Sequence, residues 1–281
     1  MEGSKISKKK KQGDEPMALD VRIAVIAGTG VYEPDIMTNV RDETVSTPYG
    51  DVQLCVGNYR GKALAFMNRH REDHSVPPHL VNYRANIAAL KKLWVKNVIA
   101  TAAVGSLNPD MQPGQFIFVD QFLDFTKARP QTFFEGGASG VLHLDMTEPY
   151  CPGLRKILLQ AAKSLGFTAH PAGTYVCTEG PRFETPAEIK MYRMLGGDLV
   201  GMTSVPEVTL AREAEMCYAT IAMVTNYAAG ISPTRLTHQE VVDMMLQNGE
   251  NIRKLIMQAV ALIDADRTCR CQRALDQTSP E

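Results

Sequence analysis

The chain has 281 residues, of which 44% are hydrophobic and 22% charged, a globular mixture that excludes a disordered protein. Its formal net charge is −1, so it lacks the basic excess that is typical of a nucleic-acid-binding domain. No apolar run approaches the roughly 20 residues needed to cross a bilayer, and we therefore expect no membrane partner.

The first 20 residues predict a disordered leader and not a secretory signal, because they contain no apolar stretch. Lys8–Lys11 form a basic run that we interpret as part of this solvated leader, with nuclear localisation as the alternative. Six cysteines are scattered without a CxxC pair or histidines at metal-ligand spacing, which predicts reduced thiols in the cytoplasm and no metal site. Cys269 and Cys271 fall in a tail, 267–281, that we expect to be flexible, with loose thiols rather than a redox pair.

Apolar runs alternate with amphipathic stretches between residues 21 and 266, which predicts one α/β domain. In its first half, the pattern predicts strands at 21–30 and 62–68, a helix at 79–93 and a strand at 97–107. The last of these is an uninterrupted apolar run, as in strands that are buried on both faces. The strand–helix–strand order indicates a sheet with a parallel core.

The second half repeats this alternation up to a long final helix. Strands are predicted at 173–181, 198–203 and 218–230, and helices at 152–166, 186–197, 205–216 and 237–264. Thr237 and Glu240 form a capping box at the start of the final helix. Residues 127–147, rich in glycine and phenylalanine, predict a long functional loop. The fold class is therefore a single-domain mixed sheet flanked by helices.

Three segments at the ends of predicted strands have the chemistry of an anion site. In Gly28-Thr29-Gly30 the glycines let backbone N–H groups turn toward an anion, but the third glycine of a dinucleotide fingerprint is absent, which excludes a dehydrogenase. Arg69 and His70 offer several donors to a phosphate. Thr203 precedes a helix, where its hydroxyl either serves an anion or only caps the helix.

Two further segments suit a planar heterocycle. Phe183 and Glu184 follow one predicted strand, and Asn226 lies near the end of another. A carboxylate acceptor, an amide that both donates and accepts, and an aromatic ring together match the edge and the face of a purine. The residues alone therefore predict an anion site and a heterocycle site within one domain.

The chain resembles the family of trimeric purine nucleoside phosphorylases and methylthioadenosine phosphorylases. The resemblance extends over about residues 21–264. It is carried, in family order, by RHREDH (69–74), VNYRANI (81–87), AVGSL (103–107), PGQFIFVDQFLD (113–124), EGPRFETPAEI (179–189), GMTSVPEVTLARE (201–213) and the TN pair (225–226). It implies the phosphorylase fold, a homotrimer, and phosphate as co-substrate without metal or organic cofactor.

Residue by residue, the resemblance also implies where each part of a nucleoside and phosphate would bind. Asn226 and His70 are the implied catalytic residues. The remaining implied contacts are Thr29, Arg69, His70, the backbone near Ala102, and Thr203 for phosphate; Met202, His238 and, from a neighbouring subunit, His143 for ribose; and Phe183, Glu184 and Asn226 for the base.

Two departures from the methylthioadenosine branch concern the base. That branch has aspartate where this chain has Asn226 and Ala228, and a small residue where it has Glu184. A 6-oxopurine presents an N1–H donor and an O6 acceptor, which suit a carboxylate and an amide, whereas adenine reverses both. We therefore expect phosphorolysis of inosine, guanosine or 5′-methylthioinosine in purine salvage. His238, in the segment T-H-x-E-V, resembles the histidine with which inosine phosphorylases contact the 5′-hydroxyl of the ribose, and it favours a substrate with that group. The alternatives are a 5′-methylthioadenosine phosphorylase of methionine salvage and an inactive nucleoside-binding member of the fold.

Overall fold

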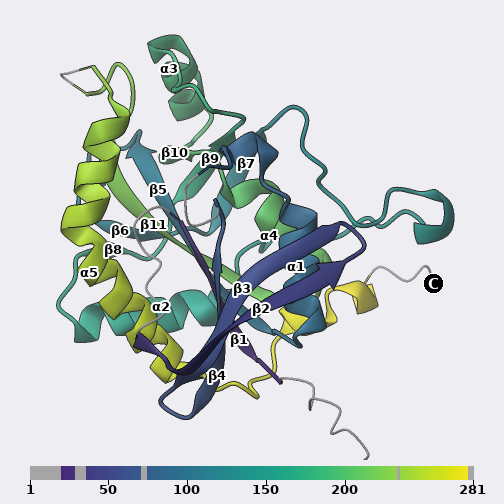
Figure 1. The fold of residues 1–281 in the computed structure, drawn as a ribbon. Helices are drawn as coiled ribbons and strands as arrows, with labels where there is room; N and C mark the ends of the chain where they lie inside the picture. Colours follow the sequence, from purple (N-terminus) through teal and green to yellow (C-terminus); the bar gives the residue numbers. More distant parts are fainter. Residues whose placement is uncertain (1–19, 29–35, 71–74, 233–234, 278–281) are drawn as a thin grey trace, which may run out of the picture.

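The computed structural model describes residues 20–28, 36–70, 75–232 and 235–277 (Figure 1). Lys8–Lys11, Thr29 and most of the predicted leader lie outside these ranges. The described residues form a mixed sheet with helices on both faces, which confirms the predicted fold class.

The sheet is parallel at its centre and antiparallel toward one edge. Strand β1 pairs in parallel with β4 and β5, and β5 pairs in parallel with β11, whereas β2, β3 and β4 pair antiparallel. The strands are β1 (Ile23–Ala27), β2 (Thr38–Thr47), β3 (Gly50–Tyr59), β4 (Lys62–Asn68), β5 (Asn97–Ser106), β6 (Phe116–Phe118), β7 (Gln121–Phe125), β8 (Ala169–His170), β9 (Thr174–Thr178), β10 (Leu199–Gly201) and β11 (Cys217–Tyr227).

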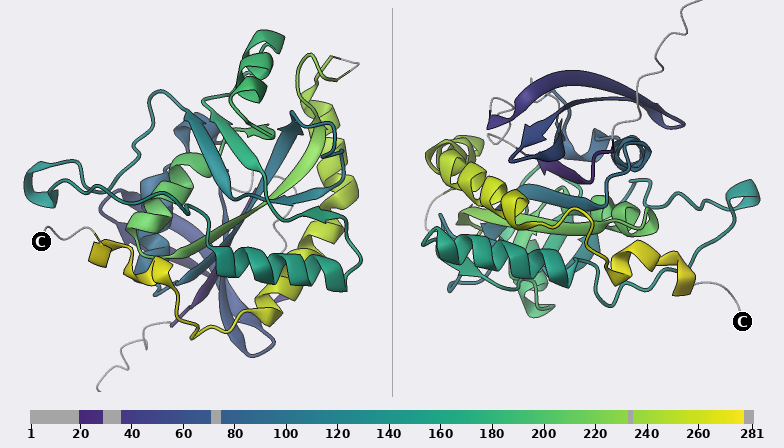
Figure 2. Two further views of the ribbon diagram at one scale, coloured as in Figure 1. Left: turned by 180° about the vertical axis from the view of Figure 1, so that it is seen from behind. Right: turned by 90° about the horizontal axis from the view of Figure 1, so that it is seen from below.

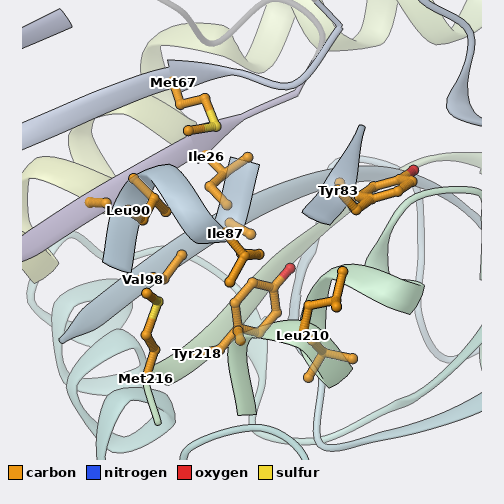
Figure 3. Close-up of a cluster of buried hydrophobic side chains, with 14 of the residues drawn as sticks. Ile26, Met67, Tyr83, Ile87, Leu90, Val98, Leu210, Met216 and Tyr218 are labelled. Carbon is orange, nitrogen blue, oxygen red and sulfur yellow. The ribbon is translucent and has the colours of Figure 1, made fainter. Parts of the chain in front are cut away.

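Helices cover both faces of this sheet, as the two views of Figure 2 show. The α-helices are α1 (Tyr83–Lys92), α2 (Pro152–Ser164), α3 (Pro186–Met194), α4 (Ser204–Glu213) and α5 (His238–Leu262). Helices α1 and α4 share one hydrophobic cluster with the sheet, and α2 and α5 share another. Figure 3 shows part of the first cluster, in which Ile87 from α1, Leu210 from α4 and Tyr218 from β11 meet. Burial of these apolar faces holds the layers together.

The helix boundaries follow from their capping residues. Thr237 caps α5 and Glu240 returns the hydrogen bond, which confirms the predicted capping box. Helix α1 begins at Tyr83 and not at 79, because the Asn82 side chain caps it by accepting from the Ala85 amide. None of the helices in the described part of the chain is long and apolar enough to span a membrane.

The predicted loop at 127–147 leaves the body of the domain as an extended arm, drawn in teal in Figures 1 and 2. A 3-10 turn at Gly137–Ser139 forms its tip, and Val141 is 72% exposed. The base of the arm is packed, since Thr132 and Phe133 both donate to the Glu213 carboxylate. Residues 137–141 at the tip are exposed in the part of the chain that the structure describes, and a loop of this length is usually functional.

The segment after α5 is packed, and the expectation of loose tail thiols is wrong. A 3-10 helix, Arg270–Arg273, follows the turn after α5, and Cys271 is 4% exposed within it. Cys271 and the buried Ala274 supply the apolar contacts that keep the segment against the domain up to Gln277.

Candidate active site

Parallel pairing brings the predicted anion-binding segments to one edge of the sheet. Strands β1, β4 and β5 point the same way, and their register sets Ala27 beside Asn68 and Ile26 beside Ala100. The residues that follow each strand therefore meet, and the Gly28 amide donates to the Thr101 hydroxyl at 2.8 Å. Ligands bind α/β sheets at this edge.

Arg69 lies at this edge but is held inside the protein by a partner that the sequence analysis missed. Its Nε and Nη2 both donate to the Glu207 carboxylate, each at 2.7 Å, and Nη1 donates to the Thr101 carbonyl at 2.8 Å. The Tyr218 hydroxyl donates to the same carboxylate at 2.6 Å. Burial lowers the pKa of Arg69, but the charge and hydrogen bonds of Glu207 outweigh it and raise the pKa, so the guanidinium stays charged.

The guanidinium of Arg69 has more N–H donors than these partners occupy. A Cβ on Gly28 would lie 3.5 Å from Nη1 of Arg69, an ordinary contact, and 3.2 Å from the Thr101 carbonyl oxygen, which is tight. Glu207 therefore orients the buried Arg69 cation beside the Gly28 backbone. An anion bound there can accept hydrogen bonds from the remaining N–H groups of Arg69.

His70 follows Arg69 and has a fixed ring. Its Nδ1 lies 2.9 Å from the Val76 carbonyl, and because a carbonyl only accepts, Nδ1 is the protonated nitrogen. The His70 amide also donates to the Asn68 side chain at 3.3 Å. These contacts fix the orientation of the imidazole ring.

Thr203 precedes α4 without capping it. Its hydroxyl makes no cap hydrogen bond, while its backbone N–H donates to the Tyr175 hydroxyl at 3.2 Å. Glu207 lies one helical turn further on, and its ion pair with Arg69 brings the start of α4 to the same edge of the sheet. The simple capping role for Thr203 is therefore wrong, and its side chain is buried beside Tyr175.

Glu184 lines a small cavity of about 130 Å³ together with Thr178, Gly180, Arg182 and Tyr192, among others. The Thr178 hydroxyl donates to its carboxylate at 2.7 Å. Burial raises the pKa of Glu184, and the hydrogen bond from Thr178 only partly offsets this. The carboxylate also has a hydrogen bond with its own backbone, and it remains part of the cavity lining.

Asn226 is aimed by an irregularity in its strand. The register of β11 against β5 shifts between Val224 and Asn226, as in the β-bulges found beside many active sites. The Asn226 amide accepts from the Thr225 hydroxyl at 2.7 Å and donates to the Tyr227 carbonyl at 2.9 Å. These bonds fix the amide oxygen and nitrogen in place while leaving one lone pair and one N–H for a ligand.

Arg129, which the sequence analysis did not single out, joins the two halves of the site. Its guanidinium donates to the carbonyls of Met202 and Val205 before and within α4, and to those of Thr178 and Glu179 at the end of β9. It comes from the polar arm, where one arginine among several charged residues gives no signal in a single sequence.

The remaining predicted residues are divided between exposed and buried positions. Phe183 is 37% exposed, and His143 and His238 are exposed on the arm and at the start of α5. Ala102 is buried on β5, next to Thr101. Met202 lies against Gly180, where a Cβ would come within 2.6 Å of its sulfur. Neither Phe183 nor Asn226 lines the cavity of Glu184, so their roles stay predictions.

Comparison with known proteins places the chain in a family. Residues 22–261 match the model of the phosphorylase superfamily. The chain is 61% identical over 254 residues to a probable 6-oxopurine nucleoside phosphorylase of Moorella thermoacetica, covering 90% of this chain and 98% of the relative. It is 57% identical over 259 residues to a 6-oxopurine nucleoside phosphorylase of Pyrococcus furiosus, covering 90% and 97%.

A solved structure agrees in fold. The methylthioadenosine phosphorylase from Schistosoma mansoni in complex with adenine has a TM-score of 0.86 and 35% identity, covering 92% of this chain and 96% of that one. The family that the sequence resembles is thereby confirmed from sequence and from structure. The chain belongs to the phosphorylase superfamily.

Proposed function

We propose that the protein phosphorolyses a 6-oxopurine nucleoside, such as inosine, guanosine or 5′-methylthioinosine, to the free base and the (methylthio)ribose 1-phosphate. The buried Glu184 carboxylate carries this proposal, because it accepts from the N1–H of a 6-oxopurine and faces a lone pair in adenine. Leaving such a buried group unpaired costs about 1–3 kcal/mol, which is tens-fold in preference. The names of the relatives from Moorella and Pyrococcus support the same base.

The chemistry follows from a phosphate held at the edge of the sheet and a base held by Glu184 and Asn226. A phosphate oxygen attacks C1′ while the bond from C1′ to N9 breaks, and the electron pair passes into the purine, which takes a proton at N7 from solvent. Arg69 offsets the phosphate charge, and the sugar passes through an oxocarbenium-like state, as in glycoside hydrolysis. Asn226 accepts from N7–H and donates to O6. The proposal requires no metal or organic cofactor in this site.

A panel of inosine, guanosine, adenosine and their 5′-methylthio forms, each with and without phosphate, tests the proposal. We expect phosphate-dependent release of hypoxanthine or guanine far faster than release of adenine. A preference for methylthioadenosine would favour the alternative activity, which the structural neighbour from Schistosoma keeps as the second candidate. Absence of phosphorolysis across the panel would identify an inactive member of the fold.

Glu184 predicts a specific pH dependence. Its carboxylate must be ionised to accept from N1–H, so activity on inosine should fall as pH drops through its pKa, which burial raises above the ordinary 4.5. The side chain in the variant Glu184→Gln cannot titrate. We therefore expect this variant to have a lower activity on inosine but not to lose further activity over the same pH range. The ratio of wild-type to variant kcat/KM, measured against pH, removes the titration of phosphate itself. A ratio that stays flat down to the ordinary carboxyl range contradicts this role.

We further propose a homotrimer in which the arm reaches a neighbouring subunit. The arm extends from the body of its own chain (Figure 2), and its Val141 and His143 are exposed. Equilibrium sedimentation should give a trimer, and His143→Ala should raise the KM for the nucleoside by roughly tenfold, the effect of one lost hydrogen bond to a ligand. A fully active monomer at working concentration would contradict the assembly.

A further inference from the structure

Four cysteines that are far apart in the sequence meet at one place in the fold. They are Cys151 before α2, Cys217 at the start of β11, and Cys269 and Cys271 in the C-terminal segment. Figure 2 shows this segment, drawn in yellow, beside the start of α2. Their sulfur atoms all lie within 4.8 Å of one another, and Cys151, Cys217 and Cys271 are buried. The spacing of these cysteines in the sequence matches no common zinc motif and predicts no metal site.

The spacing of the sulfur atoms fits a shared ion. Zinc lies about 2.3 Å from a thiolate sulfur, so neighbouring sulfurs in a tetrahedral site are about 3.8 Å apart. Here the Cys269 sulfur is 3.7 Å from Cys151 and 3.6 Å from Cys271. Cys269 therefore lies about equally close to two other sulfurs, at the spacing expected around one ion.

The surroundings of this tetracysteine cluster offset negative charge. The Arg267 guanidinium donates to the Cys217 sulfur at 3.0 Å, approaches Cys151 at 3.8 Å, and is oriented by the Asn97 side chain at 3.1 Å. A Cβ on Gly153 would collide with this guanidinium, so a larger residue there would shift the arginine away from its present position. A tetrathiolate zinc centre carries a net negative charge, and an arginine that donates to its sulfurs is the kind of outer partner such sites have.

We propose that Cys151, Cys217, Cys269 and Cys271 bind one Zn²⁺. Binding displaces the thiol protons into solvent, and the four thiolates fill the tetrahedral shell, as in structural rather than catalytic zinc sites. The cluster lies at the start of β11, whereas Asn226 is near its end, about 30 Å away for an extended strand of this length. The ion therefore fastens the C-terminal segment to α2 and β11 and takes no part in phosphorolysis.

The first test is the metal content of the full chain, purified under reducing conditions from zinc-supplemented cells. Elemental analysis should find about one zinc per chain in the wild type and in Cys55→Ser, whose position on β3 is outside the cluster. The double variant Cys269→Ser/Cys271→Ser should lose the zinc, melt several degrees lower, and keep its nucleoside phosphorolysis at low temperature. A zinc-free wild type, or a double variant that keeps the metal, would overturn the proposal.

The second test does not depend on any variant. Reduced wild-type protein, stripped of metal by a chelator and titrated with Co²⁺, should develop the intense visible bands of tetrahedral cobalt bound by four thiolates. Zinc added afterwards should bleach these bands at one equivalent. An octahedral cobalt spectrum, or mass spectrometry showing that the four thiols form disulfides under the same reducing conditions, would overturn the site.

Discussion

Replacing Arg69 with alanine is expected to reduce phosphorolysis at least tenfold and to destabilise the fold by about 3–5 kcal/mol. The loss of rate follows from removing a charge-assisted donor to phosphate, where each factor of ten corresponds to about 1.4 kcal/mol. The loss of stability follows because Glu207 would remain buried without its cation, held only by the Tyr218 hydroxyl. Phosphate KM, kcat and the free energy of unfolding should be measured on the same preparation.

The variant Glu207→Gln separates these two effects. It removes the carboxylate but keeps the cation of Arg69, so it should lower stability while retaining more phosphate affinity than Arg69→Ala. If Arg69→Ala instead leaves the phosphate KM unchanged at a temperature where it is folded, Arg69 is a structural residue and not a ligand. A common loss of phosphate affinity in both variants would show that Glu207 sets the position of the guanidinium.

Asn226→Asp should have the largest effect on substrate choice. We expect kcat on inosine to fall by about 10²–10³, the range for loss of a donor at a site of developing charge. The relative rate on adenosine should rise, because its exocyclic amine donates to a carboxylate. The Tyr227 carbonyl, which now accepts from the Asn226 amide at 2.9 Å, would face a carboxylate oxygen and disfavour the present orientation.

Combination with Glu184→Ser provides the control for this prediction. Both residues are proposed to contact one purine ring, so the effects of the two substitutions on the ratio of inosine to adenosine rates should not add. Kinetics of the four proteins on both nucleosides decide the question. Strict additivity, or an Asn226→Asp variant that still prefers inosine by the wild-type ratio, would exclude the base-selecting pair.

The sequence predicted the fold best where one physical signal dominated. The apolar run at 97–107 was expected as a buried strand, and β5 (Asn97–Ser106) has that place. The hairpin of β2 and β3 was missed, because β2 is exposed along most of its length and its polar residues give no apolar pattern. The first helix was predicted to begin at 79, because the apolar periodicity already starts before Asn82. In the structure Asn82 caps the helix, which therefore begins at Tyr83.

From the sequence, the site could be predicted only where one short segment contains recognisable ligand-binding side chains. Arg69 and Thr203 stood out at the ends of strands, but Glu207, which joins them, looks in sequence like any acidic residue in a first helical turn. The ligands of the tetracysteine cluster come from three distant segments, and only the fold reveals their proximity. The spacing of residues in a single sequence does not show which distant cysteines lie close together in the fold.

The four carbonyl contacts of Arg129 have a consequence for protein engineering. One guanidinium joins the end of β9, which leads to Glu184, to the start of α4, which carries Thr203. A graft of the loop after β9 from a methylthioadenosine phosphorylase would therefore keep its position only if its backbone carbonyls still met the guanidinium of Arg129. Chimeras of this family should exchange the arm and the loop after β9 as one cassette.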